Sequence, residues 1–286
     1  MAKNINNDWD SHFLEQSLIF ADLKLLLEQS NWTDWPGSQG LLALLDKPVI
    51  LSSGHTLAMH PQDETLPFPD MGYEERVYKK GIISTREQNW HDLFNALIWV
   101  LFPQTKILLN SLHIQELERQ PGKKRTPARD AITHLDESGI IIASSNPTYL
   151  QALKDHQWQS VFLQARSHWF SKDGFSESRQ QQSIGAFVFG HGMYEKAFTP
   201  FIGFTGKAYC LEVDDNFFQC DKMSQYKKLD QLLSSDIKTN NSLADSSYLS
   251  PLPILGIPGW AKENESPEYY QNTNYFRPKI RHKAKS

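Results

Sequence analysis

One segment of this 286-residue chain limits its fold more than any other, because it has no polar face. Residues 96–102 read ALIWVLF, an unbroken apolar run, so a helix over them must be buried on all sides. Pro103 follows at once, and proline is tolerated in the first turn of a helix but not in its interior. Upstream, TREQ from Thr85 is typical of a capping box. The pattern predicts helices over 85–102 and 103–120 that meet at a sharp corner.

The remaining segments predict short elements of both kinds. AITHLDESGIIIAS contains two β-prone runs around the turn-forming residues DESG, which predicts a hairpin. Further helices are expected over 8–29 in two pieces, 38–45, 73–80, 147–156, 157–170, the HGMYEKAF segment and 220–236, with a strand over 207–213, a mobile connection over 171–183 and a polar linker over 238–247. PLPILGIPGW suits an extended segment pinned against the core.

These elements define the expected fold class and domain organisation. We expect an α+β fold with a mainly helical core, a small antiparallel hairpin or sheet and an extended Pro-rich carboxy-terminal segment. Residues 1–278 are predicted to form a single domain, in which 1–70 is a helical extension packed on the core. Residues 279–286, which carry Arg281, Lys283 and Lys285, are expected to be a basic disordered tail.

Composition excludes several classes of protein. Hydrophobic residues make up 40% of the chain, which is enough for a large core and argues against disorder. A net charge of −4 gives no overall attraction to nucleic acid, so nucleic acid is not an expected partner. Cys210 and Cys220 lack the spacing of a disulfide framework or a structural zinc site. With no signal peptide and no membrane span in the sequence, we expect a cytoplasmic protein without a membrane partner.

Polar residues inside the two apolar helices are the first candidates for a site. His91 and Asn95 lie on one stripe of the first helix, with Asp92 beside them. Asn110 and His113 form a similar pair on the second helix. Buried polar groups must be hydrogen-bonded, so these residues either tie the two helices together or form a ligand or substrate site.

The HGMYE segment and a basic loop supply the other candidates. His191 and Glu195 are four residues apart, a spacing that suits metal ligation or a glutamate that orients a histidine in the core. The loop with Lys123, Lys124, Arg125 and Arg129 is either a solvated surface or an anion site, since arginine forks bind phosphate. Asp130 and Asp136 are placed in or near the first strand of the hairpin, and Asp136 is also suited to its turn.

Several long motifs then occur in a fixed order over residues 73–278. NWHDLFNALIWVLFPQTKILLNSLH, RDAITHLDESG, FGHGMYEKAFTP, PLPILGIPGW and YFRP resemble the signature segments of a bacterial family known as domain of unknown function 3025. The resemblance implies no reaction. It places His91, Asp92, Asn95, Asn110, Arg129, Asp130, Asp136, His191 and Glu195 within the motifs.

Two hypotheses for the function follow from these residues. The first is a hydrolase of phosphate-containing substrates, in which His91, Asp92, Asn95, Asp130, His191 and Glu195 are catalytic and Asn110, His113, Arg129 and Asp136 bind the substrate. The second is a non-catalytic binding or scaffold protein whose buried polar residues are structural. A small-molecule or phosphate-containing ligand is the expected partner, and no motif identifies a cofactor. The enzyme hypothesis requires that His91, His113 and His191 converge.

Overall fold

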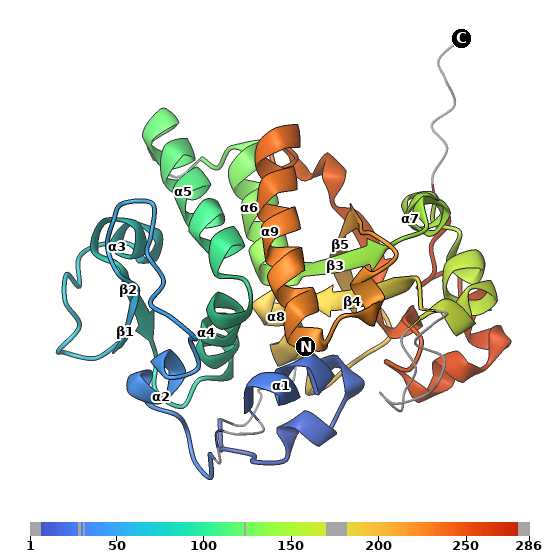
Figure 1. Ribbon diagram of the computed structural model, residues 1–286, viewed down its shortest axis with the longest axis horizontal. Helices are drawn as coiled ribbons and strands as arrows, with labels where there is room; N and C mark the ends of the chain where they lie inside the picture. The colour runs from blue at the N-terminus through green and yellow to red at the C-terminus, as the bar shows by residue number, and fades with distance from the viewer. Residues whose placement is uncertain (1–6, 28–29, 31, 123, 170–181, 280–286) are drawn as a thin grey trace. The chain divides into compact units, whose positions relative to one another are not determined.

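The computed structural model describes residues 7–27, 30, 32–122, 124–169 and 182–279, and it divides into two compact units (Figure 1). Unit 1 comprises Met1–Gly139, Val188–Thr199 and Lys222–Leu249, and unit 2 comprises Ile140–Phe187, Pro200–Asp221 and Ser250–Ser286. Lys123, residues 280–286 of the predicted tail and most of the predicted mobile connection lie outside the described residues. The α+β class is confirmed, whereas the single domain stays a prediction.

Unit 1 is mainly helical, with one small parallel sheet. Its elements are η1 (Phe13–Glu15), η2 (Leu18–Leu23), α1 (Lys24–Leu27), α2 (Ser38–Leu42), β1 (Ala58–Pro61), α3 (Tyr73–Lys80), β2 (Ile82–Thr85), α4 (Trp90–Leu101), α5 (Pro103–Arg119), α6 (Pro127–Ser138), α8 (His191–Ala197), α9 (Lys222–Asn240) and η7 (Ser246–Tyr248). Strands β1 and β2 pair in parallel, and α5, α6 and α9 lie side by side (Figure 1).

The corner at Pro103 is confirmed, but the first helix begins later than predicted. Helices α4 and α5 are bent by 111° at the break between them. Thr85 belongs to strand β2, where it pairs with Pro61, so it is not available to cap a helix. Gln88 adopts a positive φ of 50°, and the Asn89 side chain caps α4 by accepting from the Asp92 amide. Among the described residues, no single helix has the length and apolar character needed to cross a membrane.

The predicted hairpin at AITHLDESG is wrong. This segment is helix α6, which runs to Ser138, and a strand begins only at Gly139. The Thr126 side chain caps the helix by accepting from the Arg129 amide, and Pro127 occupies its first position. Ala131, Ile132 and Leu135 are its buried residues, a helical spacing that outweighs the turn-forming character of DESG.

Helix α9 fixes the start of α5 inside unit 1. It extends to Asn240, so the polar linker predicted from Lys238 begins later than expected. The carboxylate of Asp230 accepts hydrogen bonds from the backbone amides of Gln104 and Thr105, at 2.9 and 2.8 Å. These amides lie in the first turn of α5 and have no partner within the helix, so Asp230 supplies it from the neighbouring helix.

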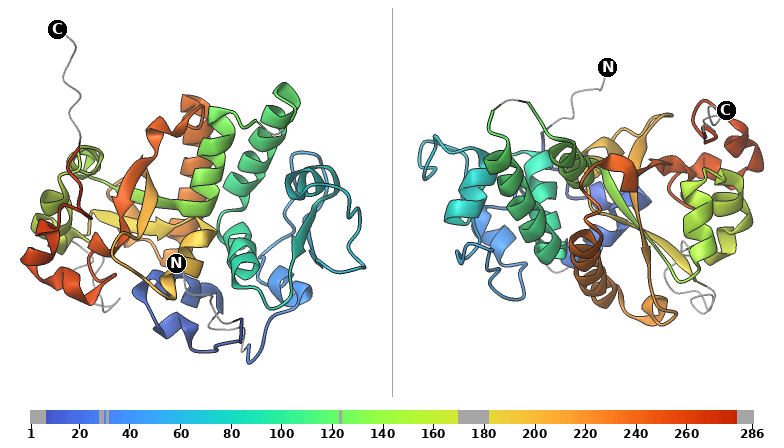
Figure 2. Two further views of the ribbon diagram at one scale, coloured as in Figure 1. Left: turned by 180° about the vertical axis from the view of Figure 1, so that it is seen from behind. Right: turned by 90° about the horizontal axis from the view of Figure 1, so that it is seen from above.

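Unit 2 is built on a four-stranded sheet with the order β4-β3-β5-β6 (Figure 2). Its elements are β3 (Gly139–Ser144), α7 (Pro147–Lys154), the π-helical η3 (Gln159–Gln164), η4 (Arg166–His168), β4 (Ile184–Val188), β5 (Thr205–Glu212), η6 (Phe217–Gln219), β6 (Ser250–Pro253), η8 (Ile254–Gly256), η9 (Lys262–Glu265) and η10 (Pro267–Gln271). PLPILGIPGW is pinned as predicted, because its first residues form β6, antiparallel to β5, and Leu252 and Ile254 are buried.

Candidate functional site

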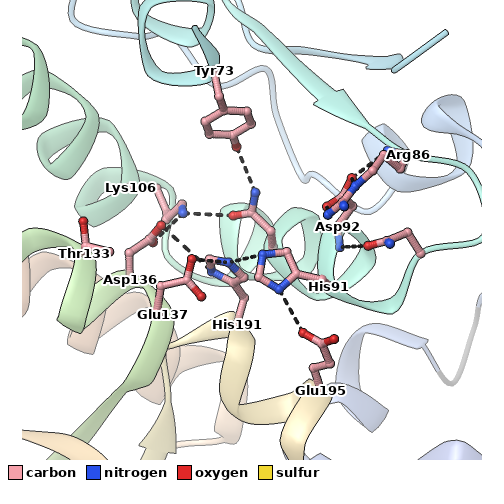
Figure 3. Close-up of polar contacts among 12 residues, drawn as sticks. Tyr73, Arg86, His91, Asp92, Lys106, Thr133, Asp136, Glu137, His191 and Glu195 are labelled. Atoms are coloured by element: carbon pink, nitrogen blue, oxygen red, sulfur yellow. Dashed lines mark hydrogen bonds and ion pairs between the residues drawn. The ribbon is translucent and has the colours of Figure 1, made fainter. Parts of the chain in front are cut away.

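Two histidines from helices α4 and α8 meet in unit 1 (Figure 3). The Nε2 atoms of His91 and His191 are 3.1 Å apart. On the other side of the His91 ring, Nδ1 lies 3.0 Å from Oε2 of Glu195. His191 and Glu195 are four residues apart on α8, so one helical face presents both to His91. The side chain of His191 is 4% exposed, whereas that of His91 is 31% exposed, which leaves one side of the pair open to solvent.

Glu137 completes the cluster from the end of helix α6. Its Oε1 atom lies 3.5 Å from Nε2 of His191. Helix α8 approaches α6 closely because glycines begin it: a Cβ atom on Gly190 would lie 2.5 Å from the Ser138 amide nitrogen, and one on Gly192 would lie 2.9 Å from the Glu137 carbonyl oxygen. These two glycines therefore allow His191 to reach Glu137.

A buried lysine links the cluster to the corner between α4 and α5. Lys106 is 5% exposed, and its Nζ lies 2.5 Å from Oδ1 of Asp136 and 3.0 Å from Oδ1 of Asn95. Asn95 in turn donates to the Tyr73 hydroxyl at 2.9 Å (Figure 3). The other Asp136 oxygen, Oδ2, lies 3.9 Å from Nδ1 of His191. A continuous set of polar contacts thus runs from α3 to the histidine pair.

The charges of the cluster shift the affinities of its groups for protons. The hydrogen bond that His91 donates to Glu195 raises the pKa of His91 and lowers the pKa of Glu195. Contact with His191 lowers the pKa of Glu137. Burial is the largest single effect on Asp136 and opposes its ionisation, but attraction to the Lys106 ammonium and to the histidines, together with the hydrogen bond from Lys106, outweighs it and lowers the pKa of this carboxyl. Three ionised carboxylates therefore surround the two imidazoles.

Five of the residues predicted as catalytic or binding lie in this network: His91, Asn95, Asp136, His191 and Glu195. The remaining predicted residues lie apart from the histidine pair. Asp92 is held by Arg86 through its backbone amide and its guanidinium, and Asn110 donates to Oε2 of Glu74 at 2.6 Å. Asp130 pairs with Arg125, while Arg129 lies in the first turn of α6 and His113 lies near the end of α5.

Of the three histidines that were predicted to converge, only His91 and His191 do so. Among the described residues, the potential metal-ligating group consists of His91, Glu137 and His191, with all donor atoms within 4.8 Å of one another. His113 is not part of it, because it lies on α5 two turns beyond Lys106.

Sequence reasoning did not assign Glu137, Lys106 or Tyr73 to the site. Glu137 was not considered as a site residue because DESG was interpreted as a turn. Had PARDAITHLDES been taken as a helix, Arg129 and Asp136 would have shared one stripe, with Glu137 beside it. Lys106 and Asn110 share a stripe of α5, but no sequence signal indicates that Tyr73 lies near this stripe.

Comparison with known proteins identifies a family whose activity is not known. A family model described as "Protein of unknown function (DUF3025)" matches residues 60–280, which include every residue of the cluster. No curated protein and no solved structure matches the chain significantly.

Proposed function

The chain belongs to the DUF3025 family, whose function is unknown, and we propose from its site that it is a hydrolase of phosphate-containing substrates. The observation that carries the proposal is the convergence of His91, His191 and Glu137 on one point that solvent can reach. Two imidazoles and a carboxylate at this spacing supply the electron pairs needed to activate a water molecule. Glu195 holds the His91 ring through Nδ1 at 3.0 Å, and Asp136 faces Nδ1 of His191 at 3.9 Å.

In the proposed reaction, a water molecule at this point attacks phosphorus and the bond to the ester oxygen breaks. The proton of the water passes to the cluster, and the leaving oxygen takes up a proton from solvent. The carboxylate of Glu195 favours positive charge on the His91 imidazole, which supports proton uptake there. Glu137, whose side chain is 42% exposed, stands at the side where a substrate enters.

Arg129 supports phosphate as the recognised group. Its Nε and Nη1 atoms are buried and have no hydrogen-bond partner among the described residues. Buried guanidinium donors without partners are costly, and such donors match the oxygens of a phosphate. Arg129 and Asp136 are seven residues apart on α6 and so lie on one stripe, with about 10 Å between their Cα atoms. A substrate that reaches the histidine pair can extend to Arg129 along this helix.

The alternative, a binding or scaffold protein, is supported by the saturated polar residues. Asn95, Asn110 and Asp92 all have intramolecular partners, which is typical of structural ties. His91 and Glu137 differ, because both are partly open to solvent. Removal of a structural tie lowers stability, whereas removal of a functional group leaves stability unchanged or raises it.

The test is turnover of aryl phosphate monoesters and diesters by the full chain, measured with and without added Zn²⁺, Mn²⁺ or Mg²⁺. We expect hydrolysis that falls by at least about 100-fold in His191→Gln and Glu137→Gln. Arg129→Gln should raise KM more than it lowers kcat. His134→Gln, which changes an exposed residue on α6, is the matched control. Absence of turnover with every substrate and ion, or full activity in His191→Gln, would refute the hydrolase.

A further inference from the structure

Three donor atoms in unit 1 lie around one point, and two of their separations match the coordination of a single ion. With metal–nitrogen distances of about 2.0 to 2.1 Å, a 3.1 Å separation between the Nε2 atoms of His91 and His191 corresponds to an angle of about 100° at the metal. The 3.5 Å from His191 Nε2 to Glu137 Oε1 corresponds to about 115°. Both angles are close to tetrahedral, whereas the donor atoms of His91 and Glu137, which lie within 4.8 Å of each other, must come closer when they share an ion.

The positions of the protons on the two imidazoles also indicate that a cation lies between them. Nδ1 of His91 faces the ionised Glu195 and therefore carries a proton, which leaves a lone pair on Nε2 in the neutral ring. If the proton of His191 is on Nδ1, directed at Asp136, two lone pairs and the Glu137 carboxylate face one another. That arrangement repels unless a cation lies between them.

The other tautomer of His191 is unfavourable for a different reason. With its proton on Nε2, His191 donates to His91 but leaves a bare lone pair on Nδ1, which is buried and has no hydrogen-bond partner among the described residues. The nearest anionic atom is Oδ2 of Asp136, at 3.9 Å, so this lone pair faces a negative charge. A cation between the two Nε2 atoms allows both Nδ1 atoms to carry protons towards carboxylates.

The surroundings of the rings match those of metal-bound histidines. Such histidines donate their second nitrogen to a carboxylate, which fixes the ring and makes it a stronger ligand. Glu195 does this for His91 at 3.0 Å, and Asp136 stands behind His191, anchored by Lys106 through its other oxygen. Each imidazole thus has its own carboxylate, supplied by a different helix.

We propose that His91, Glu137 and His191 bind one divalent transition-metal ion, of which Zn²⁺ is the best match, with a further position open to water or substrate. Two nitrogen donors and one oxygen donor suit Zn²⁺, whereas Mg²⁺ and Ca²⁺ favour sites made only of oxygen. The same donor set with an open position is used in catalytic zinc sites. The partial exposure of His91 and Glu137 provides that opening. A bound Zn²⁺ polarises water and phosphoryl oxygens, which would supply the activation that the proposed hydrolase requires.

The experiment measures Zn²⁺ binding to the full chain after removal of metals with a chelator. We expect one Zn²⁺ per chain by calorimetry, and Co²⁺ should give the intense visible absorption of a four-coordinate site. Affinity should fall by at least about 100-fold in His191→Gln and Glu137→Gln, since each loses a ligand, and by about 10 to 100-fold in Glu195→Gln and Asp136→Asn, which keep all ligands. His113→Gln and His134→Gln should bind as the wild type does.

Glu137→Gln keeps the result interpretable even if the histidine variants unfold, because the side chain is partly exposed and the substitution preserves its size. The inference is overturned if the wild type binds no Zn²⁺ or if Glu137→Gln binds it with unchanged affinity. Turnover that survives complete metal removal overturns the metal centre as the catalytic group and leaves the hydrolase standing. Binding of one Zn²⁺ without turnover of any phosphate ester confirms the metal site and refutes the proposed reaction.

Discussion

The Nε2 atoms of His91 and His191 lie 3.1 Å apart although the two residues are separated by 100 positions in the chain. Direct contact between two imidazole nitrogens has to be stabilised by a shared proton or a shared cation. The polar contacts of the pair with Glu195, Glu137 and Asp136 add negative charge around it. The site is therefore organised for positive charge at its centre, which is the basis of the predictions below.

The Lys106 and Asp136 pair should be coupled in stability. Lys106→Met leaves a carboxylate that is 21% exposed without its cation, and we expect a loss of about 3 kcal/mol in the free energy of unfolding. The double variant with Asp136→Asn should recover part of this loss, because no buried charge remains unpaired. Urea unfolding of the wild type, both single variants and the double variant gives the coupling. Additive losses would contradict the pairing.

Asp92 should behave as a structural residue and not as a catalytic one. Its carboxylate accepts the Arg86 amide at 2.6 Å and the Arg86 guanidinium at 2.7 and 3.0 Å, on the side of α4 away from the cluster (Figure 3). Asp92→Ala should lower the free energy of unfolding by about 1 to 2 kcal/mol. Zn²⁺ affinity, measured by calorimetry, should remain within about threefold of the wild type. A large loss of affinity without a loss of stability would assign Asp92 to the site.

Gly190 should be essential for bringing α8 to α6. In Gly190→Ala the new Cβ atom would lie 2.5 Å from the Ser138 amide nitrogen, so the start of α8 must move and carry His191 with it. We expect a loss of about 1 to 3 kcal/mol in stability and a weaker Zn²⁺ site. Gly37→Ala is the matched control, because nothing lies within 4 Å of its Cβ position. Thermal melts and calorimetry on both variants test this prediction, and equal behaviour would disprove the close approach.

His113 should make stability depend on pH. Burial lowers its pKa, repulsion from Arg129 and Arg125 lowers it further, and only Asp136 acts in the opposite direction. Between the lowered pKa and the unfolded value of about 6.5, the unfolded chain binds more protons, so stability rises with pH. The penalty appears as pH falls through 6.5 (the approximate unfolded pKa) and is complete below the folded pKa. Urea unfolding from pH 8 to pH 5 should show a shallower loss in His113→Asn than in the wild type, with His134→Asn unchanged.

Some elements were predictable because one local signal dominates. The run from Ala96 to Phe102 admits no exposed face, and Pro103 fits only at a helix start, so the corner follows from the sequence alone. Gly81, which ends α3 with a φ of 73°, is a further local signal. Helix α6 was missed because DESG has the composition of a turn, whereas the packing of Ala131, Ile132 and Leu135 decides the outcome.

The sequence indicates several residues of the candidate site but not which residues they contact. His91, His191 and Glu195 stand out as polar residues in apolar segments, and helical spacing explains why His191 and Glu195 point the same way. Their convergence with Glu137 depends on how three helices pack, which periodicity within one segment does not specify. The close approach that places them together is made by backbone at Gly190, a feature that no side-chain pattern records.

The order of the three proposed ligands along the chain has a consequence for biosynthesis. After Gly139 the chain leaves unit 1, forms a segment of unit 2 and returns only at Val188, shortly before His191. A growing polypeptide therefore carries at most two of the donors until that return segment has emerged from the ribosome. Binding of the proposed metal would then require that the chain segments before Gly139 and after Val188 have already packed together.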